Sequence, residues 1–407
     1  MRSFLVCILC LMAYHGYGQS EIEWLLLAEK RLSLGDTTAA INSFSRALEK
    51  NPANPAGAIR LAEVYREIQE FDKALLYINT AGEILDEKRQ SEEINAVRNR
   101  LNWSSETKEI YQTKINQLSK TEAITSHVKG TIFKERGQLT NAYNAFYEAY
   151  QLDSSNLEIV VDLGLISFSS GHVLLSKKFM NRAIELSPDN PYVLFNFANI
   201  HSRLQEYEKA IIAYKRAAEL DSTLILPHLY LGDIYFEKEQ YDSAIYFYTH
   251  YSARDSLNEK AFFKSALAHY QLGHKQDAID NWLSVVKIND ENVDAHLNIG
   301  LTFSEIKKYD QAIIHFNQTI SLAPDKNAAY MHRGHALSQM GQHKEAKTDL
   351  DYTIKILPKY AYGYYYRALH YQKTNKRKKS CRDLNKALAL GLSNEQVDDS
   401  LLFFCQN

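Results

Sequence analysis

Chain-breaking residues are scarce in this sequence, and so are cysteine and an excess of either charge. The 407 residues include 7 prolines, 16 glycines and 4 cysteines, and the formal net charge is −2. So little proline and glycine argues against a low-complexity or loop-rich chain, and so few cysteines exclude a disulfide-dense scaffold. A nearly neutral chain also lacks the basic surface that phosphate binding needs, so we expect no nucleic-acid partner.

Motifs with a known chemistry are missing as well. We find no glycine-rich phosphate loop, no HExxH, no paired CxxC and no GxSxG. The best metal candidate is His332 with His335, one turn apart, and His343 beyond them, but no carboxylate is placed to complete the site. Ordinary groove-lining histidines are the simpler interpretation. We therefore expect no catalytic residues, no cofactor and no bound metal.

The one long apolar run lies at the beginning of the chain. One basic residue precedes an apolar stretch at 4–13, which is followed by small residues up to 18. The stretch is too short to span a bilayer core of about 30 Å as a helix. The pattern predicts a cleaved signal peptide over 1–18, and hence a periplasmic or extracellular protein that could associate with the outer membrane. The alternative is a buried first helix.

The most informative feature is a period of 34 residues. In 191–224, apolar residues recur at helical spacing in two runs, which predicts a helix, a tight turn and a second helix. In steps of 34, the position of Ala198 is always Gly or Ala. The position of Ala210 is small in every repeat except one, where Lys108 stands. The pattern runs over 21–394 without insertion or deletion.

Seven residues of the first repeat match a known family pattern: Trp24, Leu27, Ala28, Ala40, Phe44, Ala47 and Pro52. In these residues the unit resembles the tetratricopeptide repeat (TPR). The resemblance covers nearly all of the mature chain. It implies an all-α fold, a TPR α-α superhelical solenoid of about eleven 34-residue helix-turn-helix repeats with a short C-terminal capping helix. For function it is less specific, because the family is defined by packing residues.

The period also predicts the domain boundaries. Repeats 1 and 2 cover 21–88, a degenerate repeat 3 covers 89–122, repeats 4 to 11 cover 123–394, and the cap covers 395–407. Repeat 3 keeps its length but loses most of its small residues. We predict a looser helix pair that breaks near Ser104, which can cap its second helix, and that serves as a hinge.

Two cysteines remain after removal of the predicted signal peptide, Cys381 and Cys405. A cap helix that folds back on the last repeat would bring them together, which predicts a disulfide. Closing this loop would stabilise the fold by about 3 kcal/mol. The alternative is a buried, unpaired Cys381.

In TPR proteins the first helix of each repeat lines a concave groove, so the resemblance also implies a set of partner-binding residues. They are Phe168, Tyr192, Phe195, Asn196, Asn199, Tyr230, Asp233, Phe236, Phe263, Lys264, Tyr270, Asn298, Tyr362, Tyr365 and Tyr366. Aromatic side chains are enriched in binding hot spots. Asn196 and Asn298 match the position that some family members use to bind the main chain of an extended peptide. Alternatively, the rings pack between adjacent first helices.

These features predict a non-enzymatic scaffold or adaptor in the cell envelope, with a peptide segment or a partner protein in its groove. One alternative is a structural protein that associates with itself while the groove is idle. A second alternative is a metal-binding or enzymatic role.

Overall fold

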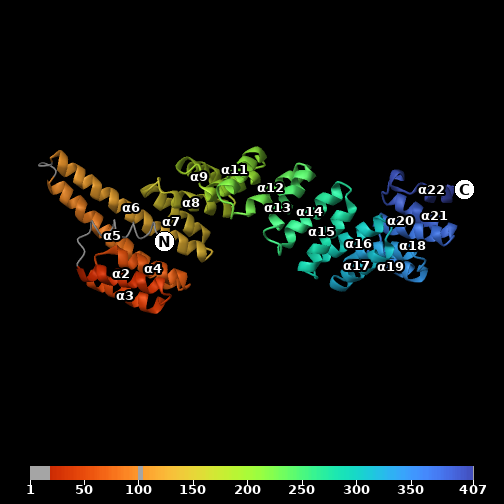
Figure 1. Cartoon of the computed structure of the whole chain (residues 1–407), viewed down its shortest axis with the longest axis horizontal. Helices are drawn as coiled ribbons and strands as arrows, with labels where there is room; N and C mark the ends of the chain where they lie inside the picture. The colour runs from red at the N-terminus through yellow and green to blue at the C-terminus, as the bar shows by residue number, and fades with distance from the viewer. Residues whose placement is uncertain (1–18, 100–103, 407) are drawn as a thin grey trace. The chain divides into compact units, whose positions relative to one another are not determined.

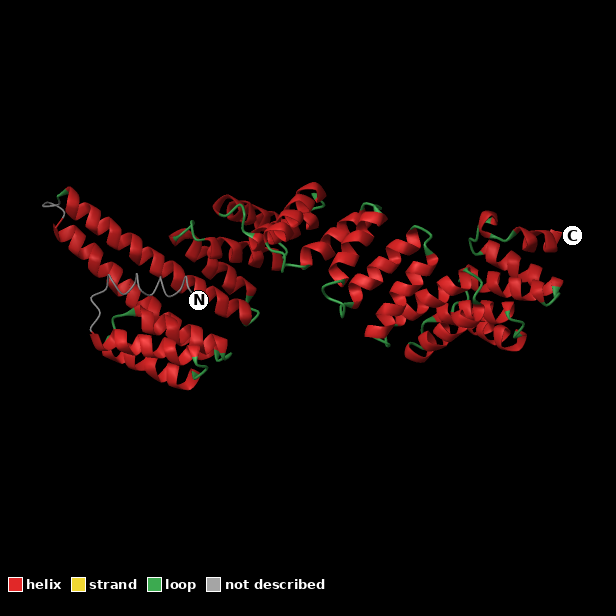
Figure 2. Ribbon diagram, viewed as in Figure 1, coloured by secondary structure: helices red, strands yellow, loops and turns green. Residues whose placement is uncertain are grey.

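The computed structural model describes residues 19–99 and 104–406, and all regular elements in these ranges are helical (Figures 1 and 2). The predicted signal peptide lies outside them. Within the described part, no helix is both long and apolar enough to cross a membrane. The chain divides after Asp221 into two units.

Unit 1 contains five helical hairpins. Its helices are α2 (Gln19–Ser33), α3 (Thr37–Lys50), α4 (Pro55–Glu67), α5 (Phe71–Asn99), α6 (Ser105–Glu135), α7 (Leu139–Leu152), α8 (Leu157–Ser169), α9 (Val173–Leu186), α10 (Pro191–Arg203) and α11 (Tyr207–Leu220). Within this unit, consecutive helices pack on one another.

Unit 2 continues the same order. Its helices are α12 (Leu226–Glu237), α13 (Tyr241–Ser252), α14 (Glu259–Gln271), α15 (Lys275–Ile288), α16 (Val293–Glu305), α17 (Tyr309–Leu322), α18 (Asn327–Gln339), α19 (His343–Ile356), α20 (Ala361–Lys373), α21 (Arg377–Ala389) and α22 (Asp399–Gln406), with a 3-10 turn at Asn394–Gln396 before α22. This stack of helical hairpins confirms the predicted all-α solenoid.

The sequence sets where the first helix of a repeat begins. An asparagine precedes it at the same position of five repeats, and its side chain accepts a hydrogen bond from a backbone amide in the first turn. The five are Asn54, Asn156, Asn190, Asn258 and Asn292. These N-caps satisfy amides that have no partner within the helix.

The small residue of each first helix allows the second helix to approach. A Cβ atom added at Gly300 would lie 2.7 Å from the ring of Phe316, and one added at Gly232 would lie 2.5 Å from the ring of Tyr248. At all five glycines of this position the large partner is 16 residues further on and buried, as Phe146 shows beside Gly130. The recurring Gly or Ala therefore accommodates a buried side chain of the second helix.

Repeat 3 departs from the rest of unit 1. Helices α5 and α6 contain 29 and 31 residues and lie side by side, extending past the shorter hairpins (Figure 1). The predicted boundaries 88/89 and 122/123 fall inside these helices, so no turn separates repeat 3 from its neighbours. Ser104 does cap α6, because its hydroxyl accepts a hydrogen bond from the amide of Thr107 at 3.1 Å. The hinge stays a prediction.

The packing positions explain these long helices. Ala96 is only half-buried and Lys108 is exposed, so repeat 3 lacks the buried small-residue contact that joins the two helices of the other repeats. The segment at 86–93 also consists mostly of good helix formers, without proline or glycine.

The C-terminal cap covers the last repeat. Leu392, Val397 and Leu401 are buried against Ala368 and Leu384, and α22 contacts both α20 and α21. The Sγ atoms of Cys381 and Cys405 lie within bonding distance, and their Cα atoms are 5.3 Å apart. That separation suits a disulfide. The bond itself stays a prediction.

Candidate functional site

The candidate site in unit 2 is the surface formed by the first helices α12, α14, α16, α18 and α20, which we call the first-helix face. Side-chain contacts join these helices to one another. Lys264 on α14 reaches α12, Tyr270 on α14 reaches α16, and Tyr366 on α20 contacts α18. The predicted groove residues of unit 2 therefore lie on one connected surface.

At the start of this face an ion pair joins two predicted groove residues. The Lys264 ammonium lies 2.6 Å from both carboxylate oxygens of Asp233, and the Tyr248 hydroxyl donates to the same carboxylate at 2.8 Å. Burial and this carboxylate raise the pKa of Tyr248. Asp233 and Lys264 thus neutralise each other, so they hold α12 against α14 and offer a ligand little net charge.

Three aromatic side chains follow on α14 and α15. Phe263 and Tyr270 pack on the buried Trp282, with ring centroids 6.5 and 6.0 Å away. The Tyr270 hydroxyl donates to the Glu305 carboxylate at 2.5 Å. Burial, with this carboxylate, raises the pKa of Tyr270 to about 12. Both predicted groove rings are partly buried, so they combine a packing role with an accessible edge.

Histidines dominate the face at α18. His332 and His335 lie 5.3 and 5.0 Å from the ring of Tyr366, and Phe316 lies on the other side of His332. Burial lowers the pKa of both histidines to about 4 and raises that of Tyr366 to about 12. All three side chains are therefore neutral near pH 7. His343 lies instead against His370, at 5.7 Å, so the three histidines considered for a metal do not converge.

Two predicted groove residues, Tyr362 and Tyr365, contact the cap. The Tyr362 hydroxyl accepts a hydrogen bond from the Gln396 side chain at 3.1 Å, and the Tyr365 hydroxyl accepts one from the Asp398 amide at 3.4 Å. Both rings pack on the cluster that buries the cap. In this structure the C-terminal segment occupies the surface of α20 where the resemblance implied a partner.

Tyr230, Phe236 and Asn298 complete the set in unit 2. Tyr230 is exposed, Asn298 is half-buried, and Phe236 packs edge to face on Tyr241 at 5.3 Å. Tyr230 and Asn298 hold the same position of their repeats as Lys264, and both face the solvent at least in part.

In unit 1, most of the predicted groove residues make contacts within the protein. Tyr192 is 54% exposed, whereas Phe168 packs into a core cluster and Phe195 packs on Tyr214 at 5.9 Å. Asn199 accepts a hydrogen bond from the Tyr214 hydroxyl at 2.6 Å. Asn196 is buried, and its side-chain amide donates to the Tyr192 carbonyl at 2.9 Å. In this structure Asn196 therefore serves its own helix, because that carbonyl is the nearest acceptor.

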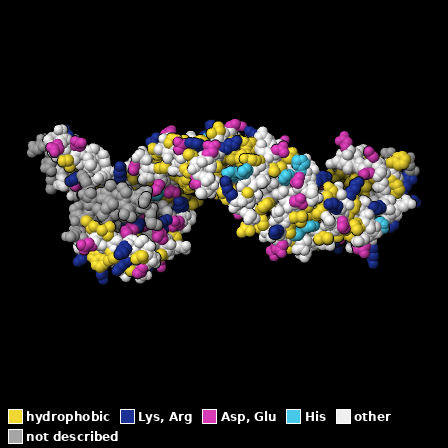
Figure 3. All heavy atoms as spheres, in the orientation of Figure 1, with side chains coloured by type: hydrophobic (Ala, Val, Ile, Leu, Met, Phe, Trp, Pro, Cys, Tyr) yellow, Lys and Arg dark blue, Asp and Glu magenta, His cyan; other side chains and the backbone are white. Residues whose placement is uncertain are grey.

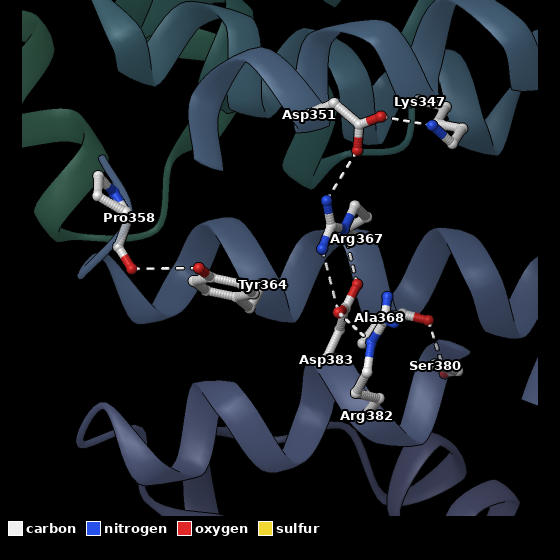
Figure 4. Close-up of polar contacts among 9 residues, drawn as sticks. All are labelled: Lys347, Asp351, Pro358, Tyr364, Arg367, Ala368, Ser380, Arg382 and Asp383. Atoms are coloured by element: carbon white, nitrogen blue, oxygen red, sulfur yellow. Dashed lines mark hydrogen bonds and ion pairs between the residues drawn. The ribbon is translucent and has the colours of Figure 1, made fainter. Parts of the chain in front are cut away.

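The resemblance did not point to one repeated polar contact in unit 2. The Arg367 guanidinium binds both oxygens of Asp383, at 2.6 and 3.1 Å, and its third nitrogen reaches Asp351 at 2.8 Å (Figure 4). One repeat earlier, Arg333 binds Asp349 in the same way, at 2.7 and 2.8 Å. The signal is visible in the sequence, because both the arginines and the aspartates recur after 34 residues.

Charge elsewhere on the surface is mixed. On the face drawn in Figure 3, basic and acidic side chains of the described residues are interspersed, and no broad area carries one sign alone. The visible surface gives no electrostatic reason to expect a nucleic acid.

Comparison with known proteins gives one consistent result. Family models described as tetratricopeptide repeat match residues 31–101, 179–212, 263–328 and 328–351. DnaJ homolog subfamily C member 7 of Mus musculus is 22% identical over 275 residues, covering 60% of this chain and 56% of its own length. A TPR repeat-containing protein of Methanocaldococcus jannaschii is 20% identical over 304 residues, covering 70% of this chain and 53% of its own length. The chain thus spans just over half the length of these curated relatives.

Solved structures give similar matches. The C-terminal part of a TPR repeat-containing protein from Cytophaga hutchinsonii is 13% identical, with a TM-score of 0.48, over 68% of this chain and 97% of that one. A tetratricopeptide repeat protein from Parabacteroides merdae is 20% identical, with a TM-score of 0.42, over 62% and 99%.

Proposed function

Because the chain belongs to the tetratricopeptide repeat family, whose members are typically non-enzymatic scaffolds for protein partners, we propose that its first-helix face in unit 2 binds an extended peptide segment of another protein. The Ser338 hydroxyl lies 3.0 Å from Nδ1 of His370, but both side chains are buried, so we propose no enzymatic step.

One observation supports this assignment above the others. One position of the 34-residue repeat remains at least partly exposed on the first helix of every repeat of unit 2. It is occupied by Tyr230, Lys264, Asn298, His332 and Tyr366, which we call the open row. At the same position in unit 1, Val128 and Asn196 are buried, whereas Leu26 and Ile94 are exposed, so the exposed position is unbroken only in unit 2.

The chemistry of the open row suits a peptide rather than a small charged ligand. Tyrosine and histidine rings offer apolar area, Asn298 offers a donor and an acceptor for a main-chain amide, and Lys264 is already paired with Asp233. An extended chain of about 3.3 Å per residue can contact successive first helices in turn. We expect the bound segment to carry apolar or aromatic side chains.

The test selects peptides from a display library on the purified full chain and measures their affinity for variants. Tyr230→Ala and Asn298→Ala should each weaken a selected peptide about tenfold or more, the loss of roughly 1.4 kcal/mol typical of a hot-spot residue. Asn196→Ala is the matched control, since Asn196 holds the same repeat position but is bonded to its own helix. Equal losses in all three variants, or in none, would refute binding at the open row.

A second candidate function is self-association through the long hairpin. Ile94, Val97 and Ile110 are 52%, 73% and 52% exposed there, which is unusual for large apolar side chains. The mass in solution should then rise with concentration, and Val97→Lys should abolish the rise. A monomer at all concentrations would exclude this alternative.

We also propose that the protein is exported to the periplasm or beyond, where Cys381 and Cys405 can form their disulfide. The apolar run at 4–13 supports this, and so does the short distance between the two sulfur atoms. Mass spectrometry of protein from native cells, alkylated before reduction, tests the bond. Free thiols at both cysteines would contradict it.

A further inference from the structure

A group of three potential metal ligands lies at the turn between α14 and α15, away from the open row. His269 is in the last turn of α14, His274 immediately precedes α15, and Asp277 is in its first turn. One ligand atom from each side chain lies within 4.8 Å of the other two. The tight turn at Gly273, with φ of +79°, brings the two helix ends together.

The buried nitrogen of this group has no protein partner. Nδ1 of His269 is inaccessible to solvent, and no hydrogen bond satisfies it. A buried polar atom without a partner is costly, so its presence calls for an explanation.

Repeat 6 provides an internal comparison, because the same three positions carry different residues there. His201 corresponds to His269, Glu206 to His274, and Lys209 to Asp277. Nδ1 of His201 is 2.7 Å from the Glu206 carboxylate, which Lys209 approaches at 3.2 Å. In repeat 6 the carboxylate satisfies Nδ1 of the histidine, although its Nε2 is buried without a partner, and a lysine stands where repeat 8 has an aspartate.

The exchange in repeat 8 therefore removes the partner of the histidine Nδ1 and adds two possible metal ligands beside it. The exchange is not explained by helix capping, since the His274 side chain makes no capping hydrogen bond. Lys275, the nearest basic residue in sequence, is directed to Glu305 at 2.8 Å. The group thus has a buried nitrogen, an exposed nitrogen and an exposed carboxylate, with no cation paired to it by a described contact.

We propose that His269, His274 and Asp277 bind a transition-metal dication such as Zn²⁺. Two imidazoles and one carboxylate are a donor set that zinc accepts, with bonds of about 2.0–2.2 Å. Only the two exposed side chains need to rotate to bring the ligand atoms closer together. Three protein ligands leave a fourth position of a tetrahedral site open for water or for a side chain of a bound protein.

The experiment titrates Zn²⁺ into the full chain, purified without a histidine tag and freed of metal, by isothermal calorimetry. His274→Ala and Asp277→Asn should each lose one binding event or weaken it at least about tenfold, because even second-shell partners contribute 10- to 100-fold to affinity. Both residues are exposed, so neither change should disturb folding.

The matched control is His172→Ala. His172 holds the position of His274 in repeat 5, but Ser167 and Leu175 stand where the other two ligands would be. This variant should bind zinc as the wild type does. Hydrogen exchange gives an independent measurement, since zinc should slow exchange at the α14–α15 turn of the wild type and leave His274→Ala unchanged.

Two results would overturn the proposal. One is a wild-type chain that takes up no zinc. The other is zinc binding of the same stoichiometry and affinity in the wild type, His274→Ala and Asp277→Asn, which would place the metal elsewhere on the chain.

Discussion

The long hairpin α5–α6 of unit 1 and the last two repeats of unit 2 share the 34-residue period but are held together differently. In the hairpin the helices are joined by ion pairs such as Lys114 with Glu92, at 3.5 Å, and the small-residue positions are not buried. In α18–α21 a small residue lets the helices meet, and an arginine binds a buried aspartate across each pair.

This difference shows that a repeat can keep its length without keeping the packing of the other repeats. The hairpin keeps the length of the repeat in frame, yet its helices run on through both expected turns. A turn forms where close helix contacts make it favourable, and the period alone does not provide them. The following changes test this comparison, beginning with the largest expected effect.

Arg367→Ala should destabilise the last repeat by about 3–5 kcal/mol, because it leaves the Asp383 carboxylate buried without its partner. Hydrogen exchange of α20 and α21 measures the loss. Arg382→Ala is the control, since Arg382 approaches the same carboxylate at 3.6 Å but is exposed. Lys114→Ala in the hairpin should cost less than about 1 kcal/mol. A loss of stability in Lys114→Ala as large as that in Arg367→Ala would contradict the proposed difference.

Cys405→Ser should release the cap and lower the stability of the last repeat by about 3 kcal/mol if the disulfide is present. Under non-reducing conditions, exchange should become faster at α22 and at the start of α21, while the hairpin, which has no cross-link, stays unchanged. Reduction of the wild type should reproduce the effect. If the variant and the oxidised wild type exchange alike, the cysteines are not bridged.

Lowering the pH should destabilise α18, and the hairpin α5–α6 serves as the internal reference. The folded-state pKa values of His332 and His335, about 4, lie below the ordinary value of 6.5. The unfolded chain therefore binds more protons between these values, and stability is lost as the pH falls from 6.5 toward 4. At pH 5 we expect a loss on the order of 1–2 kcal/mol per histidine. His335→Gln should reduce this dependence; an unchanged profile would show that His335 is not buried in its neutral form.

Gly300→Ala should cost about 1–3 kcal/mol, because the new Cβ would lie 2.7 Å from the Phe316 ring. Gly82→Ala in α5 is the matched control, since a Cβ there meets no atom within 4 Å. That change should instead stabilise the hairpin by roughly 0.5–1 kcal/mol. The same sign of effect at both glycines, measured by urea unfolding, would contradict the packing difference.

The sequence predicted much of the fold because its signals are local and repeated. The helical spacing of apolar residues and the Gly or Ala position act within one repeat, so one correct hairpin predicts its neighbours. The candidate site was harder to predict from the sequence. Side chains at equivalent positions have different roles. Asn196 bonds to its own helix whereas Asn298 stays half-exposed, and Tyr192 is exposed whereas Tyr362 contacts the cap.

The sequence by itself determined the helix-turn-helix period, the family and the pair of cysteines near the end of the chain, since these follow from spacing and residue type. Only the tertiary structure decided that α5 and α6 continue through repeat 3, that Tyr365 contacts the cap, and that Nδ1 of His269 is buried without a partner. These outcomes depend on which groups neighbouring helices bring into contact, because burial and hydrogen-bond satisfaction belong to pairs of segments rather than to one.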